Sequence, residues 1–391
     1  INLFGEDSIS GPNQIALIIS SAVAVTIALL HGFRWKEIRK QIVRSISDAM
    51  PSILILFLIG SLAGTWMLSG VVPTLIFYGL KLLNPSIFLI AAVIISAIIS
   101  IATGSSWSTI ATIGVALLGI GSALGFNVAI VAGAIISGAY FGDKMSPLSD
   151  TTNLAPAMAG TDIITHIKYM TYTTVPSIVL TLLIFTIIGF TNTPEASAVG
   201  TDVLLNTLEE IFYISPVLLI VPLILIVIII KKTPPIPALF IGTILGALAA
   251  LIFQSGLLTE LATGEHSFLE AAYITISQSM FGNLELAPDN EMVNNLLSTG
   301  GMAGMLDTIW LVLTAMAFSG IMESAGMLLR ISKAIVSFAH STGSLVLSTV
   351  VSSIIMNLTA SEQYISIVVP GRMYADIYKK KGLKPEVLSR T

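Results

Sequence analysis

The sequence predicts an all-α polytopic membrane protein with about ten or eleven transmembrane or re-entrant helices, arranged as inverted-topology repeats with broken helices. Three observations lead to this fold class. Hydrophobic residues make up 54% of the 391 residues and charged residues only 10%, which is more apolar side chain than a soluble fold buries. The charges are clustered, so the apolar stretches between them are long enough to cross a bilayer. The third observation is an internal repeat with an offset of about 256 residues.

Composition also excludes several kinds of site and partner. The chain has no cysteine, which excludes disulfides and thiolate metal sites. The net charge of −4 is small for this length and indicates neither nucleic acid nor an anionic surface as a partner. The four histidines lie far apart in the sequence, so they suggest no metal or haem site, and we expect no cofactor.

The longest charge-free stretch sets the scale of the helices. From Leu82 to Gly142 there is no Asp, Glu, Lys, Arg or His. One helical crossing needs about 20 residues, so this stretch alone has room for two or three crossings. Charge gaps and Pro/Gly punctuation predict helices over residues 13–30, 50–69, 86–103, 106–122, 127–142, 170–191, 213–230, 236–253, 306–325, 343–358 and 361–378.

The distribution of basic residues predicts an N-terminus outside the cell. With this orientation, the basic loop after the first helix falls inside, and Lys81 is the only loop cation outside. The two predicted outer loops, 192–211 and 254–305, contain acidic residues and no Lys or Arg. Residues 34–48 and 266–300 are expected to form amphipathic helices at the inner and outer interfaces.

The internal repeat divides the chain into residues 1–200 and residues 212–391, and it aligns Gly64 with Gly320. Six crossings separate equivalent helices, so the second repeat is expected to be inverted. Inverted repeats are typical of secondary transporters, whose site lies between the repeats. Generic similarity between apolar helices is the alternative. The alignment also predicts that the second repeat is truncated at its C-terminus.

The first polar cluster in apolar sequence is residues 103–109 (TGSSWST). Glycine and short hydroxyl residues between two apolar stretches indicate a helix break, where freed carbonyls and hydroxyls can replace the water shell of a cation. A tight turn at the membrane surface, or packing of Ser and Thr between helices, is the alternative.

The second cluster, residues 141–153 (FGDKMSPLSDTTN), carries two carboxylates, Asp143 and Asp150. Pro147 disfavours helix at Ser146, so the preceding helix is expected to break there. Carboxylates bind both Na+ and protons, and charges inside a bilayer are costly enough to indicate function. A cytoplasmic loop in which Asp143 and Lys144 are solvated is the alternative. Residues 153–160, which are small and apolar, are expected to form a re-entrant segment.

The third cluster, residues 357–364 (NLTASEQY), is the repeat partner of the first. Glu362 aligns with Ser105, and inverted halves would bring both breaks to one cavity. Glu323, inside another apolar run, is a weaker candidate that a helix end would explain.

The candidate site joins all three clusters. Asp143 and Asp150 are the expected Na+ ligands. The other candidate ion- or substrate-binding residues offer neutral oxygens or a third carboxylate, and they are Ser105, Ser106, Thr109, Ser146, Ser149, Thr151, Thr152, Asn153, Asn357 and Glu362.

Residues 104–109 and 141–153 resemble the NhaC family of sodium/proton antiporters. The resemblance extends from about residue 15 to the end of the chain, and its motifs are concentrated between residues 100 and 165. Members include sodium/proton antiporters and an exchanger that couples malate and protons to sodium and lactate. The resemblance therefore implies the class of transporter more firmly than its substrate.

The expected function is secondary active antiport of Na+ for H+ across the cytoplasmic membrane by alternating access. Exchange of small carboxylates, such as malate and lactate, or of amino acids is the alternative, with Lys144 or Arg372 receiving a carboxylate. The expected partners are Na+, H+, small organic acids and the lipid bilayer, and a homodimer is one assembly that the sequence allows. A channel and an intramembrane enzyme are weaker readings, because the carboxylates lie at helix breaks and no catalytic motif is present.

Overall fold

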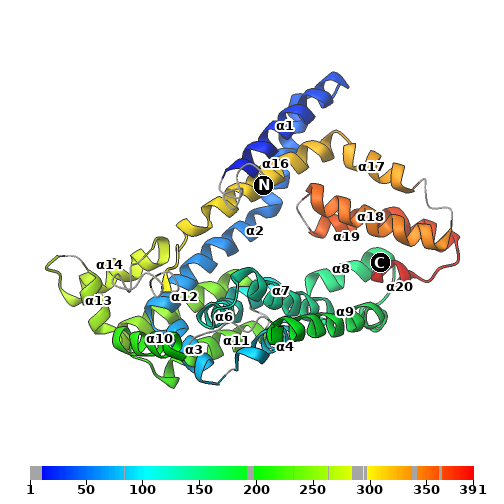
Figure 1. Ribbon diagram of the computed structural model, residues 1–391. Helices are drawn as coiled ribbons and strands as arrows, with labels where there is room; N and C mark the ends of the chain where they lie inside the picture. Colours follow the sequence, from blue (N-terminus) through cyan, green and yellow to red (C-terminus); the bar gives the residue numbers. More distant parts are fainter. Residues whose placement is uncertain are drawn as a thin grey trace. The chain divides into compact units, whose positions relative to one another are not determined.

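The computed structural model describes residues 11–82, 84–191, 198–231, 233–262, 264–283, 294, 297–336, 341–360 and 363–391, and it is helical without strands in these ranges. Figure 1 shows the helices along the chain. They are α1 (Pro12–Leu30), α2 (Trp35–Leu68), α3 (Val71–Leu82), α4 (Pro85–Thr103), α5 (Ser106–Thr109), the π-helix η2 (Ile110–Gly114), α6 (Val115–Ala123), α7 (Val128–Met145), α8 (Asp150–Ala159), α9 (Ile163–Thr191), α10 (Ala198–Ile211), the 3-10 helix η3 (Pro216–Leu219), α11 (Ile220–Ile230), α12 (Pro235–Phe253), α13 (Ser255–Leu261), α14 (Phe268–Phe281), η4 (Ala303–Met305), α16 (Leu306–Ser324), α17 (Met327–Val336), α18 (Thr342–Ala360), α19 (Gln363–Lys380) and α20 (Pro385–Arg390).

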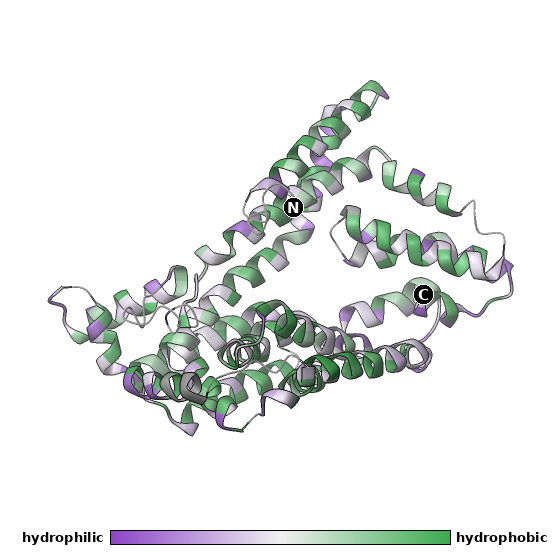
Figure 2. Ribbon diagram, viewed as in Figure 1, coloured by the Kyte–Doolittle hydropathy of each residue, from purple (hydrophilic) through white to green (hydrophobic). Residues whose placement is uncertain are grey.

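Many of these helices are long and apolar enough to cross a bilayer. Eight pass this test in the described ranges, and a ninth arises if Leu204–Ile211 and Pro216–Ile230, which meet at 88°, form one broken span. Two shorter apolar helices, Val71–Leu82 and Thr342–Leu358, add to this set. Figure 2 shows how apolar residues dominate helices such as α4, α9 and α12. The prediction of an all-α polytopic membrane protein with broken or re-entrant helices is confirmed.

Helix ends lie where they were predicted when proline or a capping residue is present at the boundary. α4 runs from Pro85 to Thr103, against a predicted 86–103. It starts there because the Asn84 side chain accepts the Ser86 N–H at 2.9 Å and Pro85 is suited to the first helical position. α12 similarly runs from Pro235 to Phe253, against a predicted 236–253.

Two predictions of local structure were wrong. The amphipathic helix expected over 34–48 and the crossing expected over 50–69 form one helix, α2, which passes through Pro51. Proline removes a single N–H donor, and the residues on both sides keep helical periodicity, so the helix continues. The outer loops expected over 192–211 and 254–305 also contain two helices that were not predicted, α10 and α13, whereas α14 lies within the helix expected over 266–300.

Contacts divide the chain into two compact units. Unit 1 consists of Ile1–Leu54, Asp150–Met170 and Leu306–Thr391, and unit 2 consists of Ile55–Ser149 and Thr171–Met305. Each unit takes helices from both predicted repeats, so the units differ from the repeats, which stay a prediction.

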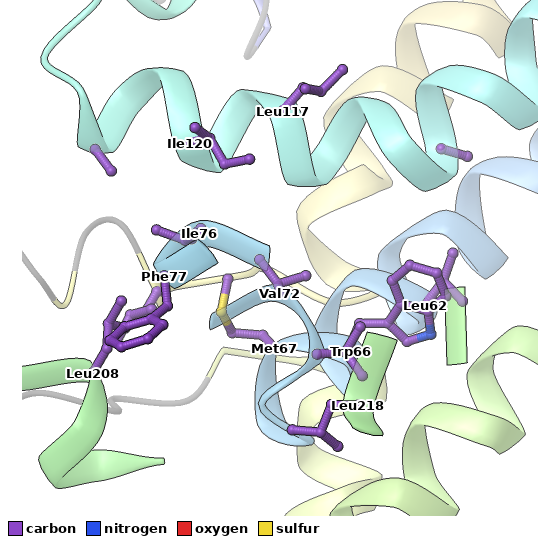
Figure 3. Packing of buried hydrophobic residues seen from close by; sticks show 14 of the residues in the cluster. Leu62, Trp66, Met67, Val72, Ile76, Phe77, Leu117, Ile120, Leu208 and Leu218 are labelled. Atoms are coloured by element: carbon purple, nitrogen blue, oxygen red, sulfur yellow. The ribbon is translucent and has the colours of Figure 1, made fainter. Parts of the chain in front are cut away.

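Unit 2 has the larger hydrophobic core, which supports the helices of the candidate site. Leu62 and Trp66 of α2, Ile76 of α3 and Ile120 of α6 are all buried in one cluster. Figure 3 shows Ile120 directed toward Ile76 within this cluster. The Trp66 indole N–H donates to the Gly242 carbonyl at 3.0 Å, which joins α2 to α12.

Unit 1 contains an antiparallel pair, α18 and α19, which we call the second hairpin. The helices lie side by side (Figure 1) and are joined by buried hydroxyls. Ser352 pairs with the Tyr374 hydroxyl at 2.8 Å, and Thr349 pairs with the Tyr378 hydroxyl at 3.1 Å. These bonds satisfy polar groups that would otherwise be costly inside an apolar helix pair.

Candidate functional site

The two residues between α4 and α5 reverse the direction of the chain. Gly104 has a φ of 70°, a left-handed conformation that glycine adopts without strain, and it ends α4. Ser105 then caps α5, because its hydroxyl accepts the Ser108 N–H at 3.2 Å. At the far end, the rings of Phe88 and Phe126 stack with centroids 5.8 Å apart. α4 and the helical stretch from α5 to α6 therefore form an antiparallel first hairpin.

α7 packs along α4 in a parallel direction. A Cβ atom at Gly138 would lie 2.1 Å from the Val93 carbonyl oxygen, and one at Gly142 would lie 2.4 Å from the Ala97 carbonyl oxygen. Both contacts advance by four residues on each helix, so the two helices run the same way. Such close backbone approach needs small residues, which are enriched between membrane helices. The end of α7 therefore reaches the tip of the first hairpin.

The break that Pro147 predicts is present directly after α7. The helix ends at Met145, and Ser146 is extended, with φ −91° and ψ 127°. The Ser146 hydroxyl donates to the Ile101 carbonyl near the end of α4 at 2.8 Å, and it accepts the Leu148 N–H at 3.2 Å. Ser146 therefore fastens the broken end of α7 to α4.

Asp143 meets Ser106 at this junction. The Ser106 hydroxyl donates to Oδ2 of Asp143 at 3.0 Å. Asp143 is 6% exposed and Ser106 is 1% exposed, whereas Lys144 is exposed. The reading in which Asp143 lies in a solvated loop is therefore wrong, because Asp143 and Lys144 both belong to α7 and the Asp143 side chain is buried.

The junction suits a small cation chemically. Two helix C-termini, those of α4 and α7, meet there, and the partial negative charge of a C-terminus favours a cation. A carboxylate and a hydroxyl side by side offer hard oxygen atoms, which can hold either a proton or a monovalent cation. Helices α4, α5 and α6 contain no Asp, Glu, Lys, Arg or His, so Asp143 carries the only carboxylate of this bundle.

Three other predicted residues bond to backbone at the junction. Ser105 caps α5, Ser146 braces the end of α7, and the Thr109 hydroxyl donates to the Ser105 carbonyl at 2.9 Å. They hold the geometry around Asp143 and Ser106. Ser149 is buried just beyond the break.

The remaining predicted residues are in unit 1 or outside the described ranges. Asp150, Thr151, Thr152 and Asn153 form the first turn of α8, where Thr152 is buried and Asp150 and Asn153 are exposed. The segment expected to be re-entrant over 153–160 belongs to this helix up to Ala159. Asn357 is exposed near the end of α18, Arg372 is exposed on α19, and Glu362 lies outside the described residues.

The list of candidate site residues left out three serines on the same helices, of which Ser108 belongs to the predicted cluster 103–109 and Ser96 and Ser100 lie outside the predicted clusters. The Ser100 hydroxyl of α4 donates to the Ala139 carbonyl of α7. The hydroxyls of Ser96 and Ser108 are buried and have no hydrogen-bond partner among the described residues. Their spacing was a usable signal, because Ser96 and Ser100 stand four residues apart and so share one face of α4.

Comparisons with known proteins agree with this architecture. Residues 12–139 and 138–391 match the Na+/H+ antiporter family. The chain is 36% identical to a malate-2H+/Na+-lactate antiporter of Bacillus subtilis, over 97% of this chain and 78% of that protein. It is 35% identical to the Na+/H+ antiporter NhaC of Alkalihalophilus pseudofirmus, over 97% of this chain and 79% of that protein.

A further relative widens the range of substrates in the family. The chain is 34% identical to the arginine/ornithine antiporter ArcD of Halobacterium salinarum, over 92% of this chain and 72% of that protein. These matches cover nearly the whole chain at more than 30% identity. This protein is therefore a multi-pass membrane transporter, not an enzyme, and it belongs to the NhaC-type Na+/H+ antiporter family.

Proposed function

We propose that this antiporter exchanges Na+ for H+ across the cytoplasmic membrane, and that the two ions compete for Asp143. One observation carries the proposal, which is the buried contact of the Asp143 carboxylate with the Ser106 hydroxyl where three helix ends meet. A buried charge is costly, so a carboxylate at such a place is best explained by an ion that it binds in turn. Protonation and Na+ binding both neutralise it.

Competition at one carboxylate is sufficient for coupled exchange. If the empty, charged site crosses the membrane poorly and either bound ion allows the crossing, alternating access exchanges one ion for the other. Ser106 supplies a second oxygen to Na+, and the backbone-bonded hydroxyls of Ser105, Thr109 and Ser146 keep both groups in place. Breaks in the helices make this geometry possible, because an unbroken α4–α6 helix could not return Ser106 to the end of α7.

We propose supporting roles at the same site for the other predicted residues. Ser149, Thr151, Thr152 and Asn153 follow Asp143 within one short segment and are proposed to add neutral oxygens. Asp150 is proposed as a second carboxylate that attracts the cation from the aqueous side, since it is exposed. Asn357 and Glu362 are proposed to serve the site from the second repeat.

Exchange of organic solutes is the second candidate function. Relatives of this chain include a malate-2H+/Na+-lactate antiporter and an arginine/ornithine antiporter. Lys144 and Arg372 are exposed cations that could receive a carboxylate, and Na+ and H+ would then be coupling ions.

Proton movement in vesicles separates these functions. The protein is reconstituted with an internal pH dye, and Na+ is added alone or with malate, lactate or arginine. We expect Na+ alone to drive proton flux in the wild type. Flux that requires an organic solute would instead support the second candidate.

Two aspartate variants locate the site in the same assay. We expect Asp143→Asn to reduce Na+-driven proton flux to background, because the amide cannot bind a proton and carries no charge for Na+. Asp150→Asn, which changes an exposed aspartate in the same polar segment, is expected to keep a measurable flux with weaker apparent Na+ affinity. Unchanged flux in Asp143→Asn would contradict the proposed site.

A further inference from the structure

We propose that one face of the first half of α2 binds the headgroups of anionic phospholipids, such as phosphatidylglycerol, at the inner side of the membrane. This face, which we call the cationic face, consists of Lys36, Arg39, Lys40 and Arg44. The net charge of −4 argues against an anionic partner, but it averages over the whole chain and hides this local concentration of positive charge. The proposal does not depend on the ion site at Asp143.

The four cations lie on one side of the helix. They follow Lys36 at intervals of three, four and eight residues, and residues three or four apart are neighbours on a helix surface. All four side chains are exposed. The opposite side is buried, because Ile38 is 0% exposed and Ser45 is 3% exposed. The first half of α2 is therefore amphipathic, with its positive charge on the uncovered side.

α16 determines which way this part of α2 faces. A Cβ atom at Gly320 would lie 2.9 Å from the Gln41 carbonyl oxygen and 2.9 Å from the Ile42 Cα. The backbones of the two helices therefore approach closely on the buried side of α2. This contact keeps the cationic face turned away from α16.

The described part of the chain does not neutralise the cationic face. None of its four side chains makes an ion pair or a hydrogen bond within the described residues, although Glu37 and Asp48 belong to the same helix. Like charges three and four residues apart repel one another and weaken a helix. Anionic groups bound along the face would remove this repulsion.

Packing within unit 1 brings the cationic face to the end of a membrane span. Ile38 of α2 belongs to one buried cluster with Ala24 and Ala28 of α1, so the start of α2 lies beside the last turns of α1. α1 is long and apolar enough to cross a bilayer. The distribution of basic residues predicts that this end of α1 is inside. We therefore expect the cationic face at the level of the inner headgroups, where anionic lipids attract basic residues.

The surroundings of the face favour a lipid over a free anion. Trp35 is 51% exposed and Val43 is 62% exposed, so apolar side chains accompany the cations. Tryptophan is enriched at membrane interfaces, and basic residues next to apolar ones are typical of helices that bind them. The cations from Lys36 to Arg44 extend over about 12 Å of helix, which a row of headgroups can cover and a single phosphate ion cannot.

The lipids around Trp35 can be measured, because this side chain is exposed next to Lys36. The full chain is reconstituted in phosphatidylcholine vesicles with a fraction of phosphatidylglycerol or phosphatidylcholine spin-labelled close to the headgroup, and the label quenches nearby tryptophan fluorescence. Trp35→Phe gives the signal of the other tryptophans, which is subtracted. We expect labelled phosphatidylglycerol to quench Trp35 more strongly than labelled phosphatidylcholine. Choline chloride should reduce this preference by screening without adding Na+.

A triple variant tests the cationic face itself. Lys36→Gln/Arg39→Gln/Lys40→Gln keeps Trp35 and removes three charges. A cation near an anionic surface strengthens binding about fivefold, so losing three corresponds to about a hundredfold and should abolish the preference. Lys36→Arg/Arg39→Lys/Lys40→Arg keeps the charges and should retain it.

A second triple variant is the matched control. Lys379→Gln/Lys380→Gln/Lys384→Gln removes the same charge from exposed positions at the end of α19 and before α20. We expect it to keep the preference of Trp35 for phosphatidylglycerol, because these lysines are not on the cationic face.

The outcomes are distinct from those of the ion-site experiments. A preference for phosphatidylglycerol that is lost only in the first triple variant supports the inference. Equal quenching by the two lipids in the wild type overturns it, and this comparison needs no variant that has to fold. An equal loss in the control triple variant, or displacement of the lipid by inorganic phosphate, also overturns it. Asp143→Asn should keep the lipid preference, so the ion site and the lipid surface can fail separately.

Discussion

The first and second hairpins contain similar hydroxyl residues but bond them differently. In the second hairpin, Ser352 and Thr349 of α18 pair with Tyr374 and Tyr378 of α19, so the polar groups satisfy one another. In the first hairpin, the hydroxyl of Ser106 bonds to a carboxylate that a third helix, α7, supplies. In the second hairpin the paired hydroxyls come from the hairpin's own two helices, whereas the hydroxyl at the tip of the first hairpin bonds to a residue of α7.

Buried hydroxyls do not by themselves distinguish an ion-binding site from ordinary helix packing. Buried hydroxyls alone are compatible with simple helix packing, as the pairs of Tyr374 with Ser352 and of Tyr378 with Thr349 show. The first hairpin adds a helix break and a hydrogen bond from the buried Ser106 hydroxyl to a carboxylate at the end of a parallel helix. Substitutions in the two hairpins should therefore separate loss of stability from loss of ion binding.

The largest expected effect comes from separating α7 from α4. In Gly142→Ala, the new Cβ would lie 2.4 Å from the Ala97 carbonyl oxygen and 2.8 Å from the Ile101 nitrogen, and backbone cannot move aside locally. Such overpacking costs about 1–3 kcal/mol or more, and it would displace Asp143 from Ser106. We expect little folded protein by fluorescence-detected size-exclusion chromatography and no Na+-driven flux.

The control for this substitution is on the same helix. A Cβ at Gly133 meets nothing closer than the Phe185 ring edge at 3.7 Å, so Gly133→Ala should fold and transport normally. Equal behaviour of the two alanine variants would refute the close packing of α7 on α4.

A smaller effect is expected in the second hairpin. Tyr374→Phe removes a hydroxyl that pairs with Ser352 and donates to the Ser348 carbonyl at 3.0 Å. Leaving these buried groups unsatisfied costs about 1–3 kcal/mol, so the unfolding temperature in detergent should fall. The KM for Na+ and the pH profile should stay those of the wild type. A changed pH profile would mean that the second hairpin also controls ion binding.

The smallest effect is expected at Ser146. Ser146→Ala loses the hydrogen bond to the Ile101 carbonyl, which corresponds to about 1 kcal/mol. Because this hydroxyl braces the backbone, we expect a slower maximal rate with a nearly unchanged KM for Na+. A strongly raised KM for Na+ would show that Ser146 is a direct ligand.

Many helix boundaries could be predicted from the sequence because glycine, proline and capping residues occur at helix ends. Gly104 and Pro147 identified the two breaks that form the site, and both are where the helices end. The contact of α7 with α4 could not be predicted, since small residues at four-residue spacing occur in many membrane helices. The continuity of α2 through Pro51 was also missed, because a single missing donor does not force a helix to end.

The candidate site was predicted as a set of residue types without their individual roles. Asp143 and Asp150 are equivalent in the sequence, but one is buried against Ser106 and the other is exposed at the start of α8. Four hydroxyls at the junction likewise divide into one that faces a carboxylate and three that bond to backbone. Only the direction of each side chain decides between these roles, and sequence spacing does not fix it across a helix break.

Gly64 and Gly320, which the predicted internal repeat aligns, both make close backbone contacts with another helix. A Cβ at Gly64 of α2 would overlap the Ser279 carbonyl of α14, and one at Gly320 of α16 would lie 2.9 Å from the Gln41 carbonyl oxygen of α2. Each glycine thus packs against an amphipathic segment from the other predicted repeat. The inverted repeats themselves stay a prediction.

Competition of Na+ and H+ at Asp143 can be measured directly as proton release when Na+ binds. Purified protein in weakly buffered detergent solution is titrated with NaCl, with choline chloride as the control salt, while a pH indicator is read. We expect Na+ to acidify the solution around the wild type, Asp143→Asn to abolish this proton release and Asp150→Asn to retain it. Proton release that persists in Asp143→Asn would contradict competition of Na+ and H+ at Asp143.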